Sequence, residues 1–159
     1  MGDEKQRKNL MNPQLQNTLF NLANTFVMPF WILLIFAPHA KLTTWIFEKA
    51  TLRPMHFLAV IYAALVIPGV LSSPQSLAVL SQPTLEGVQQ LLSNSSGAAA
   101  GWVHYLCFDL FVGAWIWKTA REKKHRFIWV SPVLFFVLML GPFGWLIFEA
   151  GSRVAQRSS

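Results

Sequence analysis

Residues 101–117 read GWVHYLCFDLFVGAWIW, a stretch that is apolar enough to lie in a lipid bilayer yet contains a histidine, a tyrosine and an aspartate. An ionisable side chain inside a membrane span is costly, about 2.5–3.5 kcal/mol for Asp on insertion scales, so it needs a local reason. One reason is a functional site, and the other is a hydrogen bond between the helices of a small bundle. The side chains expected beside Asp109 and His104 decide between these roles.

The composition is that of an integral membrane protein of one domain. The 159 residues are 53% hydrophobic and only 13% charged, whereas soluble domains carry about 25% charged residues. The formal net charge is +6, but the basic residues lie beside apolar runs, where membrane orientation and anionic lipid explain them better than nucleic acid does. The one cysteine, Cys107, excludes an internal disulfide.

Four apolar runs predict an all-α fold, an integral membrane four-helix bundle. Each run is close to the ~20 residues that cross a bilayer core. A polar tail over 1–17 precedes the membrane domain, 18–149, and a short tail over 150–159 follows it. The spans are expected over residues 18–37, 55–71, 99–118 and 127–148.

The connections between these spans differ in character. Residues 39–54 are expected to form a loop, whereas 84–92 place four apolar side chains on one side of a helix and predict a short amphipathic helix on the membrane surface. The 39–54 and 118–126 connections hold eight Lys and Arg, against five in the two tails. The positive-inside rule therefore predicts both termini on the non-cytoplasmic side.

The spans are expected to bring polar side chains together in one half of the bilayer. At about 1.5 Å per residue, Asn24 and His104 lie roughly 8–9 Å from the starts of their spans and Asp109 roughly 15 Å, near the midplane. Pro142 cannot donate to residue 138, and the glycine before it permits close approach. A freed carbonyl there would complete a polar pocket, unless the kink serves packing alone. The expected walls are aromatic: Trp31, Trp102, Tyr105, Phe108 and Phe143.

Helical geometry restricts this pocket. His104 and Asp109 are five residues apart, so their side chains point about 140° apart around the helix. Both reach one pocket only if other spans surround the third span; otherwise one of the two serves packing.

Residues 102–111, WVHYLCFDLF, contain the pattern Trp-x-His-x-Leu-x-x-Asp-Leu-Phe. With this pattern, and with MPFW at 28–31 and GPFG at 141–144, the sequence resembles the abscisic-acid-deficient-four-like family of membrane proteins. The resemblance covers roughly residues 22–148. It departs at Ala114, where many members carry Arg, so it assigns no role to that position.

The resemblance implies a four-span protein of photosynthetic membranes, whose plant member is associated with neoxanthin synthesis. That reaction is an isomerisation: an epoxide opens while a proton leaves a polyene carbon, which requires an acid and a base. It needs no redox cofactor, and no metal is expected. The chemistry suggests Asp109 as the acid and His104 as the base. Expected contacts with a carotenoid or other isoprenoid lipid are Asn24, Trp31, Trp102, Tyr105, Phe108, Gly141, Pro142 and Phe143.

An alternative is a non-catalytic protein that binds pigment or assists assembly of photosynthetic complexes. Seven Trp and thirteen Phe suit contacts with rings and polyenes. His104 could ligate a chlorophyll or haem, although a bound carotenoid is the preferred expectation. The expected location is a bacterial (cyanobacterial) thylakoid or plasma membrane, or a chloroplast membrane if the protein is plastid-derived.

Overall fold

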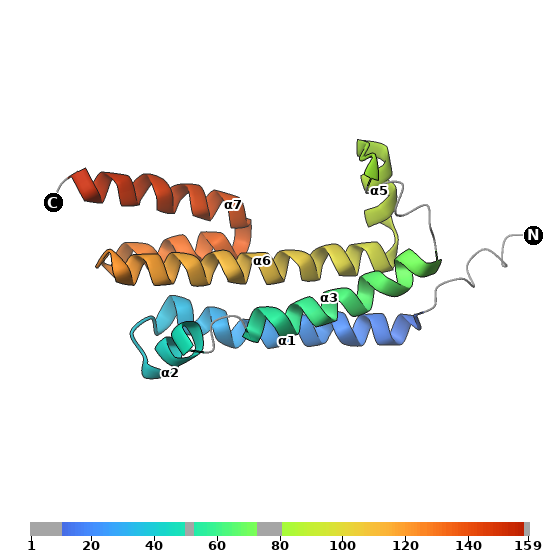
Figure 1. Cartoon of the computed structure of the whole chain (residues 1–159), viewed down its shortest axis with the longest axis horizontal. Helices are drawn as coiled ribbons and strands as arrows, with labels where there is room; N and C mark the ends of the chain where they lie inside the picture. Colours follow the sequence, from blue (N-terminus) through green and yellow to red (C-terminus); the bar gives the residue numbers. More distant parts are fainter. Residues whose placement is uncertain (1–10, 50–52, 73–80, 158–159) are drawn as a thin grey trace, which may run out of the picture. The chain divides into compact units, whose positions relative to one another are not determined.

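The computed structural model describes residues 11–49, 53–72 and 81–157, and every regular element in these ranges is a helix. Four helices there are long and apolar enough to cross a membrane: α1, α3, α6 and α7. This confirms the expected all-α membrane class, with a short amphipathic helix between the second and third apolar helices. The elements are α1 (Pro13–Phe36), α2 (Lys41–Thr44), the π-helical turn η2 (Trp45–Lys49), α3 (Arg53–Ser72), α5 (Leu85–Ser93), α6 (Ser95–Glu122) and α7 (Phe127–Arg157) (Figure 1).

The chain divides into two compact units. The first unit comprises Met1–Asn24 and Phe57–His104, and the second comprises Thr25–His56 and Tyr105–Ser159. The second unit contains most of the large buried side chains, among them Trp31, Phe47, Leu110, Ile116, Trp117, Leu134 and Phe148.

Two helices begin earlier than the apolar runs suggest, because polar residues cap them. Pro13 is the first residue of α1, where its missing N–H costs nothing, and Asn12 Oδ1 accepts a hydrogen bond from Gln14 N at 2.9 Å. Asn94 Oδ1 accepts from Gly97 N at 2.7 Å at the start of α6. At the other end of the chain α7 continues to Arg157, through most of the expected C-terminal tail.

The expected loop over 39–54 is wrong for most of its length, since α2 and η2 occupy residues 41–49. Tertiary contacts hold this segment. Thr43 Oγ1 donates to the carbonyl of Ala37 at 2.7 Å, and the Trp117 indole donates to the carbonyl of Pro38 at 2.9 Å. Phe47 is buried against the same Trp117, with ring centroids 5.8 Å apart.

The amphipathic helix α5 lies where the periodicity places it. Thr84 is its N-cap, and the Thr84 hydroxyl accepts from Gly87 N at 3.1 Å. None of the residues of α5 is buried, and Leu85 and Leu92 are among the exposed large apolar side chains. An apolar helix face left uncovered in this way suits the surface of a bilayer.

The fourth apolar segment does not form the straight span expected over 127–148. Leu140 (φ −143°, ψ 41°) and Gly141 (φ 3°, ψ −80°) leave the helical region, and α7 turns back on itself (Figure 1). Trp129 consequently stacks on Phe148 with ring centroids 5.7 Å apart. In a straight helix these residues would be about 28 Å apart along the axis.

Small residues allow the two halves of α7 to pack closely. A Cβ on Gly144 would lie 2.7 Å from Val137 Cα, and one on Gly151 would lie 3.2 Å from the Trp129 ring. Each half is roughly 20–24 Å long, which is shorter than a bilayer core of about 30 Å. The fourth segment is therefore a helical hairpin, and its C-terminal half returns toward its starting point.

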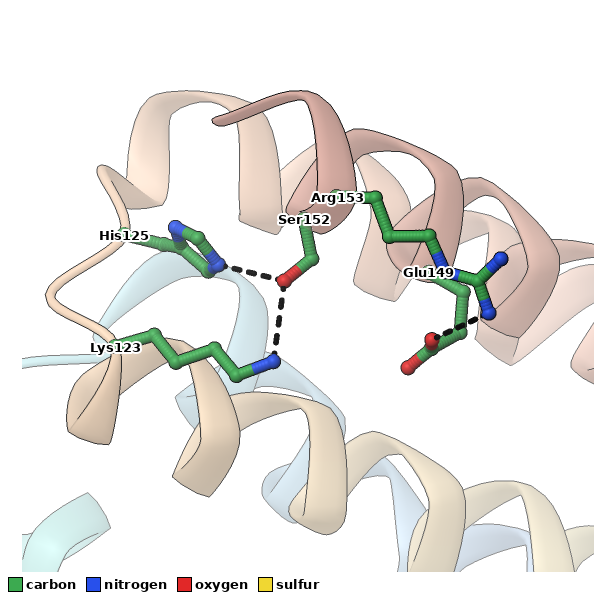
Figure 2. A network of polar contacts seen from close by, with 5 residues as sticks. All are labelled: Lys123, His125, Glu149, Ser152 and Arg153. Atoms are coloured by element: carbon green, nitrogen blue, oxygen red, sulfur yellow. Dashed lines mark hydrogen bonds and ion pairs between the residues drawn. The ribbon is translucent and has the colours of Figure 1, made fainter. Parts of the chain in front are cut away.

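The ends of this hairpin are fastened by polar contacts (Figure 2). Ser152 Oγ lies 2.9 Å from His125 Nε2 and 3.5 Å from Lys123 Nζ, and the serine is only 2% exposed. The end of α7 thus lies beside the turn that precedes it. We therefore expect the fourth segment to begin and end at the same membrane face, which a straight span over 127–148 would not do.

Candidate functional site

The carboxyl group of Asp109 lies against the bend of α7. A Cβ built on Gly141 would collide with Asp109 Oδ1, and it would lie 3.1 Å from Cγ and 3.5 Å from Oδ2. Gly141 is buried and Asp109 is partly buried. The aspartate of α6 is therefore turned toward protein backbone, as expected if it serves a site.

The bend gives this location its polar character. Pro142 has no N–H, so the carbonyl of Leu138 lacks its usual helical donor. Non-helical backbone at membrane depth is tolerated where protein covers it or where it lines a polar cavity. Asp109 provides part of that cover at Gly141. Among the residues that the structure describes, none donates a hydrogen bond to the Asp109 carboxyl or forms an ion pair with it.

Large aromatic side chains of the second unit occupy two environments. Trp31 is 1% exposed and packs on Gly113, where an added Cβ would lie 2.7 Å from its ring. Its Nε1 has no hydrogen-bond partner in the described part of the chain. Tyr105, Phe108 and Phe143 are instead more than half exposed. Trp31 is thus a core residue, while the other three present aromatic surface outward.

Asn24 and Trp102 meet in the first unit. The Trp102 indole donates to Asn24 Oδ1 at 2.9 Å, and Asn24 Nδ2 donates to the carbonyl of Phe20 at 2.8 Å. The Phe20 ring also contacts Trp102, at 6.3 Å between centroids. Both polar atoms of the Asn24 amide thus have partners: Oδ1 joins α1 to α6, and Nδ2 bonds within α1. The expected contact of Asn24 with a substrate stays a prediction.

His104 belongs to the same unit. Its ring lies 5.5 Å from that of Tyr62 on α3. The expected residues thus fall into two groups: Asn24, Trp102 and His104 in the first unit, and the remaining seven in the second. The structure brings Asp109 to Gly141 and Asn24 to Trp102, and the pairing of Asp109 with His104 stays a prediction.

Sequence reasoning missed the hairpin and the residues that fasten it. The pair Gly141-Pro142 signals a kink, but nothing in the sequence gives its angle. Ser152, in the expected tail, carried no signal for its buried contact with His125. No group of three or more His, Cys, Asp or Glu side chains in the described residues is placed to hold a metal ion.

Fold and site together define a small all-α membrane protein in which an aspartate of one apolar helix faces the bend of another. The chain belongs to the ABA DEFICIENT 4-like family (ABA4-like), whose model matches residues 18–148. This confirms the family resemblance read from the sequence.

A curated relative is "Protein ABA DEFICIENT 4, chloroplastic" of Arabidopsis thaliana. It is 27% identical over 120 residues, which are 72% of this chain and 53% of that protein, so the chain spans about half the length of the relative it matches. That relative is a chloroplast protein, and it lends no support to the expected bacterial source. No solved structure matches the chain.

Proposed function

We propose that this protein binds a carotenoid or related isoprenoid lipid within the membrane and rearranges its oxygenated ring end by acid–base chemistry, with Asp109 as the proton donor. The observation that carries the proposal is the Asp109 carboxyl placed against the Gly141 bend, inside an apolar helix. Membership of the ABA DEFICIENT 4-like family supports this substrate class, since the family resemblance implies an association with neoxanthin synthesis in plants.

The proposed reaction is the opening of a 5,6-epoxide. Protonated Asp109 donates its proton to the epoxide oxygen as the C–O bond breaks, and a base removes a proton from the adjacent polyene carbon. The product is an allene with a tertiary alcohol. The substrate gains one proton at the epoxide oxygen and loses one at the polyene carbon. The step is therefore an isomerisation that balances without a redox cofactor. His104 is the candidate base.

The substrate would lie along the outward aromatic surface of the second unit. Tyr105, Phe108 and Phe143 are 61%, 57% and 52% exposed, and Phe143 follows the bend directly in sequence. A long polyene suits such an apolar surface, while its one polar end needs a polar partner at a fixed depth. Asp109 would be that partner.

The test is to express the protein in cells that accumulate an epoxycarotenoid such as violaxanthin, and then to analyse their pigments. We expect the intact protein and Glu86→Gln, a matched acid-to-amide change on α5, to form the isomer, and Asp109→Asn to form none at equal protein level. The proposal fails if the intact protein yields no new pigment, or if Asp109→Asn converts as much as the intact protein.

A second candidate function is the binding of pigment, or the assembly of photosynthetic complexes, without catalysis. The Asn24–Trp102 hydrogen bond favours this reading, because a polar group expected at the substrate is committed to helix packing. The absorption spectrum of protein purified in mild detergent tests it. A chlorophyll or haem band that disappears in His104→Ala would support this function, and a spectrum with no pigment would oppose it.

A further inference from the structure

The fold-back of α7 gathers three distant stretches at one end of the second unit. Ser152 lies beside Lys123 and His125 (Figure 2). The segment that follows α1 reaches the same end, since the carbonyl of Pro38 accepts from Trp117 at 2.9 Å. We call this region the basic end: residues 38–49, 117–126 and 149–153.

Cations dominate the basic end. It holds eight Lys and Arg side chains against three carboxylates. Two of those carboxylates already have cationic partners: Arg121 Nε lies 3.4 Å from Glu48, and Arg153 lies 3.7 Å from Glu149. The exposed cations are Lys41, Lys49, Lys118, Lys123, Lys124, Arg126 and Arg153.

The same region carries features of a membrane–water boundary. Leu42 and Trp45 are 54% and 53% exposed, and tryptophan prefers the depth of the lipid headgroups. The apolar parts of α6 and α7 end and begin here, on either side of the turn at 123–126. We therefore expect these cations to lie at the depth of the headgroup phosphates.

We propose that the basic end binds the phosphate of an anionic phospholipid, with Lys123, Lys124 and Arg126 as its main donors. The turn between α6 and α7 supplies all three. Ser152 holds the Lys123 ammonium at 3.5 Å, so the returning half of α7 helps to position the site. Lysine and arginine attract anionic headgroups additively and in a salt-dependent way.

The experiment uses the full chain in a neutral detergent, titrated with short-chain phosphatidylglycerol or phosphatidylcholine while binding is followed by thermophoresis. We expect binding of phosphatidylglycerol only, weakened by added NaCl. The triple variant Lys123→Gln, Lys124→Gln, Arg126→Gln should bind at least about tenfold more weakly. The matched variant Lys5→Gln, Arg7→Gln, Lys8→Gln removes the same charge from the N-terminal tail and should bind normally.

Three outcomes would overturn the proposal. The first is equal binding of the two lipids, and the second is an equal loss of phosphatidylglycerol affinity in both triple variants. The third is displacement of phosphatidylglycerol by millimolar inorganic phosphate, which would indicate a site for the free anion. The double variant Lys124→Gln, Arg126→Gln keeps the Lys123–Ser152 contact. Weaker lipid binding by this variant therefore cannot arise from loss of the contact between the two ends of the hairpin. Because no carotenoid is present, failure here leaves the chemistry proposed for Asp109 untouched.

Discussion

His125 Nε2 lies 2.9 Å from Ser152 Oγ, although 27 residues separate the two along the chain. A straight helix would place them about 40 Å apart, more than the thickness of a bilayer core. The contact shows that the fourth apolar segment turns back on itself. We therefore expect the residues before and after the hairpin to face the same aqueous compartment.

Cysteine labelling in sealed vesicles checks this topology. In a Cys107→Ala background, Lys124→Cys and Arg153→Cys should both react with an impermeant maleimide from the same side. Leu140→Cys, at the bend, should stay unlabelled until detergent is added. Labelling of Lys124→Cys and Arg153→Cys from opposite sides would mean that α7 crosses the bilayer.

Gly141→Ala should destabilise the protein, because its new methyl group collides with the Asp109 carboxyl. Overpacking of this kind costs about 1–3 kcal/mol. Gly69→Ala is the matched control: within the described residues no atom lies within 4 Å of a Cβ at this position, so the change should hold or raise stability. Thermal unfolding in detergent measures both. In an Asp109→Ala background Gly141→Ala should cost clearly less, and an unchanged cost would show that the two residues do not compete for space.

Lys124→Gly should stabilise the protein. Lys124 adopts φ 55° at the end of α6, where His125 N donates to the carbonyl of Ala120 at 2.8 Å and Lys124 N donates to that of Arg121 at 3.1 Å. This is the Schellman arrangement, in which the left-handed residue is usually glycine. Relief of the left-handed conformation is worth about 1–2 kcal/mol. Lys123→Gly loses the same charge without that relief and should lower the melting temperature.

The stability of the hairpin should depend on pH through His125. Burial, with a smaller contribution from the Lys123 charge, lowers the pKa of His125 from its ordinary value of 6.5. The unfolded chain then binds a proton more readily than the folded one, so this contribution to stability is present above pH 6.5 and is lost as the pH falls below it. Melting temperatures between pH 8 and 5 measure the effect. The fall on acidification should be smaller in His125→Gln, and an equal fall would contradict the assignment.

Composition and periodicity were sufficient for the class of fold and for α5. They marked apolar runs but not helix ends, because ends are set by caps such as Asn12 and Asn94 that lie outside those runs. The helices over 41–49 depend on contacts with Trp117, which no local pattern encodes.

The candidate site, too, was predictable from the sequence only in part. The rise per residue along straight spans predicted Asp109 and Gly141 at a similar depth in the membrane. The structure brings the two residues into contact, but α7 bends at Gly141 and is not straight. The angle of the bend follows from close packing, as of Trp129 on Phe148, which sequence spacing cannot supply. The catalytic roles of Asp109 and His104 stay predictions.

The absence of a side chain at Gly141 leaves room that the Asp109 carboxyl fills. We therefore expect positions 109 and 141 to be kept or to change together: a relative with a larger residue at the bend would need a side chain shorter than Asp109 and would lose the proposed proton donor. Coupled substitution at these two positions would record this constraint in the history of the family.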